Sequence, residues 1–489
     1  MREKLKELAG QTVTYGIFNI VGRFLTFILF PLYINYLPKA EYADIVILYS
    51  YIGIFNVLYA TALESSFFRY YDKTDIQKSR AVFSHAFIAI FIFGLVVSSI
   101  IFAFADELTF ILSGEIENSA ELIMLAAFVP LIDAIQFIPF GLLRMNNKAR
   151  SFVMIRFVHV IVYVSLNYIA ITYFGMGVFA VLVIQIVASL TTLAIQSKEI
   201  IANLVFSYDS KLFRTMLKYG IPTLPAALST IFLNVADKPI VKEFAGSDAQ
   251  AVYSANYKLG IPMLLFITAF DYAWRPFFLN NYKNDGSNEL FAKILTYFTL
   301  IGAAIFLSFS FFVGYLVQTP FIGGRKLLPN DYTEGLVIIP IILLAYWFNG
   351  MYNNFSASLH IAKKTKYLAY SIVTGTAVYF VALYTLVPNV GYIGAAWATL
   401  IGFATNSVLI YYFARKSYAI KYDWPKITII AALTAAIYFA NHALNLNFGT
   451  MTDVITKISL LITFLALLRL FGFFTKQEIA AVKKLLRRK

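Results

Sequence analysis

Long apolar runs separated by short polar links follow one another along almost the entire chain. An apolar run of about 20 residues crosses the hydrocarbon core of a bilayer as an α-helix. The pattern therefore predicts an all-α integral membrane protein with about 14 transmembrane helices and no separate soluble domain. The expected spans lie near residues 11–36, 42–68, 82–105, 120–143, 151–173, 176–196, 217–242, 249–274, 291–318, 334–360, 366–387, 391–414, 426–444 and 452–472.

Basic residues test this count, because cytoplasmic links of membrane proteins are enriched in lysine and arginine. When the links are numbered alternately from a cytoplasmic N-terminus, most basic residues fall in the inside links. Three outside links, near residues 105–119, 172–177 and 441–452, contain no lysine or arginine. The alternation predicts that both termini are cytoplasmic. The few basic residues expected outside are Lys39, Lys238, Lys242, Arg325 and Lys326.

Short motifs recur in the same order in the two halves of the chain. Tyr15-Gly16-Ile17 opens the first span, and Tyr219-Gly220-Ile221 opens the seventh, 204 residues later. Glycines precede the sixth and twelfth spans alike, at Gly175 and Gly391, which are 216 residues apart. The repeat predicts two six-helix lobes in the same orientation, related by an axis along the membrane normal.

The repeat also sets the expected domain boundaries. Residues 1–196 form the N-terminal lobe, residues 197–416 the C-terminal lobe, and residues 417–472 two additional C-terminal helices. In the tail, residues 473–489, apolar side chains alternate with basic ones. We expect the tail to form an amphipathic cytoplasmic helix that lies on anionic lipid.

Composition agrees with a chain surrounded by lipid. The sequence is 60% hydrophobic and 13% charged, and its mean hydropathy is +0.72, whereas soluble domains are roughly half apolar and a quarter charged. It lacks cysteine, its four histidines show no ligand spacing, and it contains no phosphate-binding loop. We therefore expect no metal, no cofactor and no enzymatic activity. The net charge of +14 is spread over many links, so no nucleic-acid partner is expected.

Cations inside apolar spans are costly to bury and usually face a bundle interior or a water-filled cavity. Arg23 in the first span and Lys258 in the eighth occupy comparable places in the two halves. One interpretation is a cationic substrate-binding cavity suited to phosphate, with Arg69 and Arg275 at its cytoplasmic rim. The alternative is internal pairing, for example of Arg23 with Glu64, together with ordinary anchoring by Arg69 and Arg275.

Other polar residues within spans are candidates for further roles. Four asparagines in the tenth and twelfth spans are candidate sugar contacts, or equally helix-packing residues: Asn349, Asn353, Asn354 and Asn406. Four acidic residues are candidates for ion coupling, or alternatively for internal pairing: Glu64, Asp133, Asp237 and Asp271.

Six sets of motifs follow in order along nearly the whole chain: Leu37–Asp44 (LPKAEYAD), Leu63–Tyr71 (LESSFFRYY), Tyr219–Pro222 with Asp237-Lys238, Tyr253–Lys258 (YSANYK), Ala269–Phe278 (AFDYAWRPFF) and Gly391–Thr399 (GYIGAAWAT). Together they resemble the polysaccharide transporter branch of the multidrug/oligosaccharidyl-lipid/polysaccharide (MOP) exporter superfamily, in particular Wzx-type O-antigen flippases. Each motif is loose alone, but the ordered set is specific for the superfamily.

The resemblance implies a V-shaped pair of lobes around a central cavity that opens alternately to each side. It implies an undecaprenyl-diphosphate-linked oligosaccharide as substrate, in the synthesis of lipopolysaccharide O-antigen or another surface polysaccharide at the bacterial inner membrane. Transport would be driven by an ion gradient or the membrane potential rather than by ATP hydrolysis. A polysaccharide polymerase and a chain-length regulator are the expected protein partners.

Three other functions remain open. Peptidoglycan-precursor flippases are similar at Lys258, where they carry an arginine, but they carry another arginine where this chain has Asn56-Val57. The family's usual Asp-Arg is Asp237-Lys238 here, a mild departure. A multidrug antiporter of the same superfamily would favour acidic residues for cationic drugs, whereas this cavity is expected to be basic. A membrane polysaccharide polymerase or glycosyltransferase tends to carry a large external loop, and the longest external links, near residues 105–119 and 319–333, are short.

Overall fold

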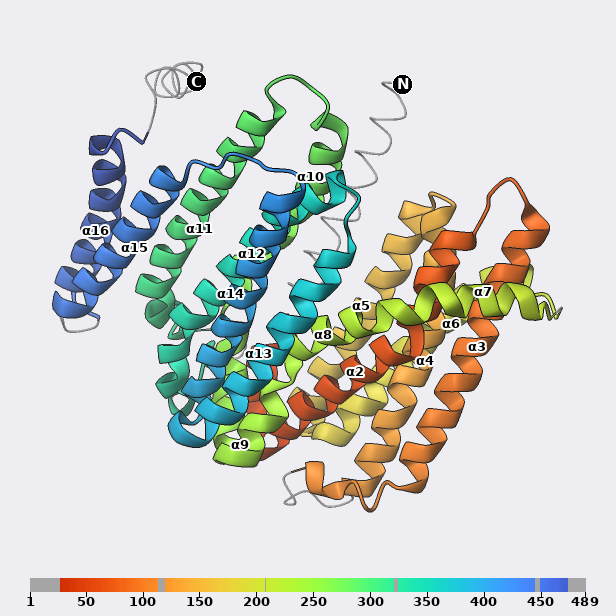
Figure 1. The fold of residues 1–489 in the computed structure, drawn as a ribbon. Coiled ribbons are helices and arrows are strands. Elements are labelled where there is room, and N and C mark those ends of the chain that lie inside the picture. The colour runs from red at the N-terminus through yellow and green to blue at the C-terminus, as the bar shows by residue number, and fades with distance from the viewer. Residues whose placement is uncertain (1–26, 113–118, 207, 321–323, 445–448, 474–489) are drawn as a thin grey trace.

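The computed structural model describes residues 27–112, 119–206, 208–320, 324–444 and 449–473. These residues form helices joined by short links (Figure 1), which confirms the all-α prediction for this part of the chain. The helices are α2 (Lys39–Tyr70), α3 (Ile76–Ala103), α4 (Ser119–Met145), α5 (Ala149–Phe174), α6 (Val178–Asn203), α7 (Ser210–Gly220), α8 (Leu224–Val235), α9 (Asp237–Lys258), α10 (Ile261–Asn281), α11 (Ser287–Val317), α12 (Ile339–Ile361), α13 (Lys366–Val390), α14 (Tyr392–Ser417), α15 (Trp424–Leu444) and α16 (Met451–Leu470).

Twelve helical segments of the described residues are long and apolar enough to cross a membrane, and one of them, Ser210–Lys258, combines α7, α8 and α9. Two of the predicted spans are not among the twelve. The first, residues 11–36, lies mostly outside the described residues, and its described end is the apolar helix Phe27–Tyr36. The eighth corresponds to α10, whose apolar character is interrupted by Asp271 and Arg275.

The helices form two groups that lie side by side in Figure 1, with α2–α6 in red to yellow and α9–α16 in green to blue. α2 runs obliquely at the boundary between them, packing against α4 of the first group, against α9 of the second, and against the connecting helices α7 and α8. The α2–α3, α4–α5 and α10–α11 links lie at the top of the view, and the α13–α14 link lies at the bottom. The exact lobe limits at residues 196 and 416 remain predictions.

The segment that joins the two groups departs from the predicted helices. Continuous spans were expected at residues 217–242 and 249–274, but the chain bends between α7, α8 and α9. Pro222 and Pro225 occupy the starts of a short 3-10 turn and of α8, where the missing N–H of proline is tolerated. Inside α9, Gly246 has a φ of 88°, a left-handed conformation that glycine adopts at little steric cost. Hydropathy does not reveal such bends, because the residues on both sides remain apolar.

The bend after α7 is held against α2 by a close backbone approach. A Cβ atom at Gly220 would lie 2.0 Å from the carbonyl oxygen of Ala62, so a larger residue does not fit there without a shift of the backbone. Ser66 Oγ donates a hydrogen bond to the carbonyl oxygen of Met216 at 2.6 Å. The glycine of the Tyr-Gly-Ile motif at residues 219–221 therefore allows the second half of the chain to cross the first.

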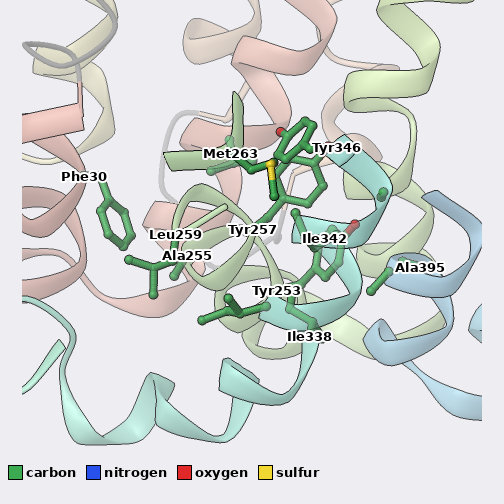
Figure 2. Close-up of a cluster of buried hydrophobic side chains, with 14 of the residues drawn as sticks. Phe30, Tyr253, Ala255, Tyr257, Leu259, Met263, Ile338, Ile342, Tyr346 and Ala395 are labelled. Atoms are coloured by element: carbon green, nitrogen blue, oxygen red, sulfur yellow. The ribbon is translucent and has the colours of Figure 1, made fainter. Parts of the chain in front are cut away.

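The last turns of α9 are anchored in the main hydrophobic core. Figure 2 shows Tyr253 and Tyr257 of α9 beside Ile342 and Tyr346 of α12, whereas Phe30 lies on the opposite side of α9. The ring centroids of Tyr257 and Tyr346 are 5.9 Å apart, in an edge-to-face arrangement that aromatic pairs favour. This packing fixes the end of α9, and with it the next residue, Lys258.

Candidate functional site

A cavity of about 380 Å³ lies where the first helix, α2, α5, α6, α8 and α9 meet. Most of its wall is apolar, but several polar side chains line it: Tyr33, Tyr49, His159, Tyr163, Gln185 and Lys258. Because α8 and α9 belong to the second half of the sequence, the cavity lies between residues of both halves. An apolar cavity with a few convergent polar groups is the usual form of a ligand site.

Lys258 is the cation of this cavity. It ends α9, and its Nζ lies 5.6 Å from the ring centroid of Phe30 and 5.4 Å from that of Tyr42. Within the described residues, no carboxylate lies within 4 Å of this Nζ. Aromatic faces stabilise a cation by roughly 0.5–2 kcal/mol, which leaves its charge available to an anionic ligand. An ammonium group in this position can therefore bind a phosphate oxygen.

Hydrogen bonds connect the cavity wall to the interior of the first half. The hydroxyl oxygens of Tyr163 and Tyr49 are 2.7 Å apart, and Tyr49 donates to Gln185 Oε1 at 3.5 Å. Gln185 Nε2 donates to Ser189 Oγ at 3.3 Å, and Ser189 Oγ donates to Asp133 Oδ1 at 2.5 Å. We call this series, from Tyr163 to Asp133, the hydrogen-bond chain. It links an acidic residue to the wall of the cavity that contains Lys258.

Asp133 of α4 shares its electrostatic environment with groups on α2 and α5. Arg156 of α5 interacts electrostatically with both Asp133 and Glu64, and Asn56 of α2 lies beside the Asp133 carboxylate. In the described part of the chain, neither carboxylate forms an ion pair shorter than 4 Å. The first half therefore holds two carboxylates and a guanidinium group that influence one another without direct pairing.

Arg156, His159 and Tyr163 were not predicted from the sequence to have a functional role. With Asn167, these residues recur at intervals of three or four along α5, which places them on one face of the helix. His159 Nδ1 lies 3.2 Å from a threonine hydroxyl of α6, and Asn167 Oδ1 accepts a hydrogen bond from Tyr33 at 3.1 Å. The polar periodicity of this span was the signal that could have identified them.

In the second half, Asp237 and Lys238 pair with each other where α9 begins. Lys238 Nζ lies 2.8 Å from Asp237 Oδ1 and donates to the carbonyl oxygen of Asn234 at 2.5 Å. Tyr253 donates to Asp237 Oδ2 at 2.5 Å, and the Asp237 N–H donates to the hydroxyl of Tyr379 at 3.1 Å. Both charged side chains are buried. Internal pairing was one of the two alternatives expected for Asp237, and the structure shows such a pair.

The residues expected at the cytoplasmic rim do not line the cavity around Lys258. Arg69 lies exposed in the last turn of α2. Arg275 pairs with Asp271, one helical turn earlier in α10, at an N–O distance of 3.4 Å, and 62% of its side chain is exposed. The pair agrees with the internal pairing that was the alternative for Asp271. Arg23 lies outside the described residues, so its predicted role stays a prediction.

The asparagines proposed as sugar contacts also lie away from this cavity. Asn349 and Asn353 are half-buried in α12, whereas Asn406 is buried in α14. Asn406 Cβ would lie 3.0 Å from a Cβ at Gly375 of α13, so Asn406 occupies a close helix–helix contact. A packing role explains the position of Asn406.

Polar contacts join the two halves where α2 and α9 begin, and we call this set of contacts the seam. Lys39 Nζ lies 3.4 Å from Asp331 Oδ2, and Lys242 Nζ lies 3.2 Å from Asp44 Oδ1. Asn35 Nδ2 donates to the carbonyl oxygen of Lys326 at 3.0 Å. Of the five basic residues expected outside, Lys39, Lys242, Arg325 and Lys326 take part in the seam, and Lys238 pairs with Asp237. Lys326 joins the seam through its backbone carbonyl, whereas the side chains of Lys39, Lys242 and Arg325 contact the other half directly.

Similarity to known proteins identifies the family and the fold of this chain. A family model described as "Polysaccharide biosynthesis protein" matches residues 8–282. No curated protein matches the sequence. The structure of the lipid II flippase MurJ in an inward closed conformation is similar, with a TM-score of 0.74 and 15% identity over 94% of this chain and 100% of MurJ. An inward-facing multidrug resistance MATE family transporter of the MOP superfamily gives a TM-score of 0.62 and 13% identity over 84% of this chain and 96% of that protein.

An outward-facing structure of a MATE family transporter is also similar, with a TM-score of 0.56 and 14% identity over 86% of this chain and 96% of that chain. At such low identities the likeness establishes the fold, and the proteins that share it are flippases and transporters rather than enzymes. The family model covers more than half of the sequence and agrees with the resemblance seen in the motifs. The chain therefore belongs to the Polysacc_synt family of polysaccharide biosynthesis proteins.

Proposed function

We propose that this protein is a flippase for an undecaprenyl-diphosphate-linked oligosaccharide, the repeat unit of O-antigen or another surface polysaccharide. It moves this lipid-linked sugar from the cytoplasmic to the periplasmic leaflet of a bacterial inner membrane by alternating access. Both termini face the cytoplasm in this proposal, because the basic residues of the links alternate in that sense. The family supports a role in polysaccharide biosynthesis.

The observation that carries the proposal is the Lys258 cavity. An ammonium group without a carboxylate partner among the described residues lies in a mostly apolar cavity between the halves. Burying a cation in a membrane protein is costly, and a diphosphate group would offset that cost when it binds. The phosphates would bind Lys258, while the sugars and the polyprenyl chain would extend from the cavity.

Alternating access requires that contacts between the halves form and break. The seam closes one end of the interface in this structure, through Lys39–Asp331 and Lys242–Asp44. The proposal places the seam on the periplasmic side, so these ion pairs must separate before the sugar is released there. In the same proposal, the hydrogen-bond chain from Tyr163 to Asp133 couples an ion gradient to the Lys258 cavity.

A second candidate is flipping of the peptidoglycan precursor, favoured by the similarity of the fold to the lipid II flippase over 94% of this chain. The two substrates share a lipid-linked diphosphate, so Lys258 suits both. Asn56 stands where the resemblance implies an arginine in those relatives, and it lies beside Asp133 rather than lining the cavity. This difference favours the polysaccharide substrate. A drug antiporter is less well supported, because the cavity lining described here contains no carboxylate.

Lys258→Gln tests the proposal. Loss of the charge should reduce flipping of an undecaprenyl-diphosphate-linked sugar in proteoliposomes by roughly 100-fold or more, since one charge-assisted contact to phosphate contributes about 1.5–3 kcal/mol and its loss also leaves the diphosphate desolvated. Lys258→Arg should retain part of the activity, because the charge is kept. Normal flipping by Lys258→Gln would overturn the cavity mechanism.

Two controls separate the outcomes. Lys283→Gln removes an exposed lysine from the α10–α11 link and should leave flipping unchanged. Expression in a strain that lacks its own O-antigen flippase distinguishes the substrates. Restored surface polysaccharide supports the proposal, whereas rescue of peptidoglycan-precursor flipping alone supports the second candidate.

A further inference from the structure

A second, larger cavity lies outside the site described above, between α3 and the segment that leads into α7. Its volume is about 630 Å³, and its wall includes Ile88, Ile92 and Phe93 of α3 with Phe206, Tyr208 and Phe213. The volume falls in the range of about 300–1,000 Å³ that is usual for small-molecule pockets. None of the groups of the Lys258 cavity takes part in it.

The polar side-chain atoms that Ser84 and His85 contribute to this second cavity are already paired. Ser84 Oγ accepts a hydrogen bond from the Val205 N–H at 2.8 Å. His85 Nε2 accepts from the Asp209 N–H at 2.9 Å, and its Nδ1 lies 2.7 Å from the carbonyl oxygen of Ala81. The cavity therefore presents mainly carbon atoms to an occupant. Such a surface favours a hydrocarbon chain over a polar solute.

The second cavity opens toward the lipid. Ile92 and Phe93 are exposed on the outer side of α3, and Phe206 is 89% exposed at the cavity mouth. α3 itself is among the least buried of the candidate membrane spans, with 22% of its apolar window buried. An acyl chain of the surrounding bilayer can therefore enter from the side.

α7, the helix that follows the cavity-lining segment at residues 205–208 along the chain, is amphipathic. Figure 1 shows it running across the view past α3, and the two helices are in contact. Met216 is buried against the core formed by α2, α3 and α4, whereas Lys211, Arg214 and Lys218 are exposed. The spacing of three and four residues places these cations on one face. A helix of this kind lies in the plane of the membrane interface with its basic face toward the headgroups.

The three cations are suited to a membrane surface. Among the described residues, no carboxylate lies within 4 Å of them. They extend over about 10 Å of helix axis, at 1.5 Å per residue, instead of converging on one point as a single diphosphate group would require. Exposed cations distributed in this way complement the phosphates of an anionic lipid leaflet.

We propose that α7 and the second cavity form a binding site for an anionic glycerophospholipid of the bilayer. The basic face formed by Lys211, Arg214 and Lys218 attracts the anionic headgroup, and one acyl chain occupies the cavity between α3 and α7. Because α7 leads into the bend at Gly220, the lipid is bound at the junction of the two halves. This site is independent of the transported substrate, and its test measures lipid binding rather than flipping.

Native mass spectrometry of the full chain, purified in detergent and mixed with phosphatidylglycerol or phosphatidylcholine, tests the headgroup contacts. The wild-type protein should retain phosphatidylglycerol in preference to phosphatidylcholine. The triple variant Lys211→Gln, Arg214→Gln, Lys218→Gln should lose this preference by on the order of 100-fold, because each cation contributes about fivefold. The matched control has three exposed cations in the α12–α13 link and at the start of α13 replaced, as Lys363→Gln, Lys364→Gln, Lys366→Gln, and it should keep the preference.

Two further variants test the cavity without changing the charge. Ala89→Trp and Ile92→Trp both fill it from α3 and should lower the retention of both lipids, whereas Ile100→Trp lies elsewhere on the exposed face of α3 and should not. Ile92 is already lipid-exposed, so its replacement leaves the fold intact even if Ala89→Trp does not.

Three results would overturn the site. They are an unchanged preference in the α7 triple variant, an equal loss in the control triple variant, and unchanged retention in both cavity variants. Tighter retention of farnesyl diphosphate than of phosphatidylglycerol would instead identify a polyprenyl ligand and overturn the choice of occupant.

Discussion

The charged groups of the two halves are arranged differently, although the sequence motifs repeat. In the first half, Asp133, Glu64 and Arg156 interact electrostatically at a distance, and Asp133 connects through hydrogen bonds to the Lys258 cavity. In the second half, Asp237 is paired with the adjacent Lys238 and is buried, and Asp271 is paired with Arg275 one turn away.

The difference indicates that the motifs that recur in the two halves do not bring the same arrangement of charges with them. Paired charges satisfy each other locally, and the removal of one partner leaves the other buried and uncompensated. Charged groups without a direct partner can bind or release a proton or a ligand with a smaller loss of folding stability. We therefore expect substitutions of the paired charges in the second half, Asp237 with Lys238 and Asp271 with Arg275, to act on stability, and substitutions of the unpaired charges in the first half to act mainly on transport.

The largest effect should follow Asp237→Asn. This change leaves the buried Lys238 ammonium without its carboxylate and should lower the free energy of unfolding by about 3–5 kcal/mol. Thermal unfolding in detergent and the amount of protein in the membrane measure it. The double variant Asp237→Asn, Lys238→Met should recover most of the loss, because no uncompensated charge remains. Full stability of the single variant would show that the pair is not structural.

Asp133→Asn should lower transport and leave stability nearly unchanged, which is the reverse of the effect expected for Asp237→Asn. The amide can still accept the hydrogen bond from Ser189, so stability should change by no more than about 1 kcal/mol. Transport driven by an imposed ion gradient should fall by at least about tenfold if Asp133 is the coupling group. Proteoliposomes with separate proton and sodium gradients measure this response. The control, Asp271→Asn, lies outside the hydrogen-bond chain, and an equal effect there would contradict the comparison.

Tyr163→Phe should have a smaller effect. It removes the hydroxyl that lies close to the hydroxyls of both Tyr33 and Tyr49, at a cost of about 1–2 kcal/mol for two hydrogen bonds. Transport should fall severalfold and become less sensitive to the ion gradient. In the second half, Tyr379→Phe removes a comparable buried hydroxyl and should lower stability without altering the gradient response. Identical gradient responses in the two variants would show that the hydrogen-bond chain does not couple.

Arg275→Gln should have the smallest effect. Its ion pair with Asp271 is mostly exposed, and such pairs contribute about 0.5 kcal/mol or less. We expect an unchanged unfolding temperature and unchanged flipping, because Arg275 does not line the cavity. A strong loss of flipping at normal protein levels would restore the rim role that the sequence suggested.

The sequence predicted much of the helical architecture because hydropathy is a local property. The span near residues 178–203 is an example, since its apolar residues are contiguous and its helix, α6, extends a few residues beyond the predicted 176–196. The segment at residues 217–258 was less predictable. Its bends depend on Pro222, Pro225 and Gly246 and on the crossing of Gly220 over α2, and hydropathy does not register them.

The candidate site was only partly predictable. Lys258 could be recognised from its charge within an apolar span, and the cavity around it agrees with that interpretation. The partners of the other charges could not be recognised in the same way. Asp44 and Lys242 are 198 residues apart, yet they form an ion pair, and Arg275 faces Asp271 instead of the cavity.

By itself, the sequence determined that the chain is helical and embedded in a membrane, and its motifs indicated the superfamily. These properties depend on how many apolar residues follow one another and on which short motifs recur. The tertiary structure decided which polar groups meet. Tyr49 and Tyr163 come together from α2 and α5, 114 residues apart, because contacts between helices depend on how each helix is rotated and tilted against its neighbours. That geometry arises from packing over the whole chain, which no local pattern contains.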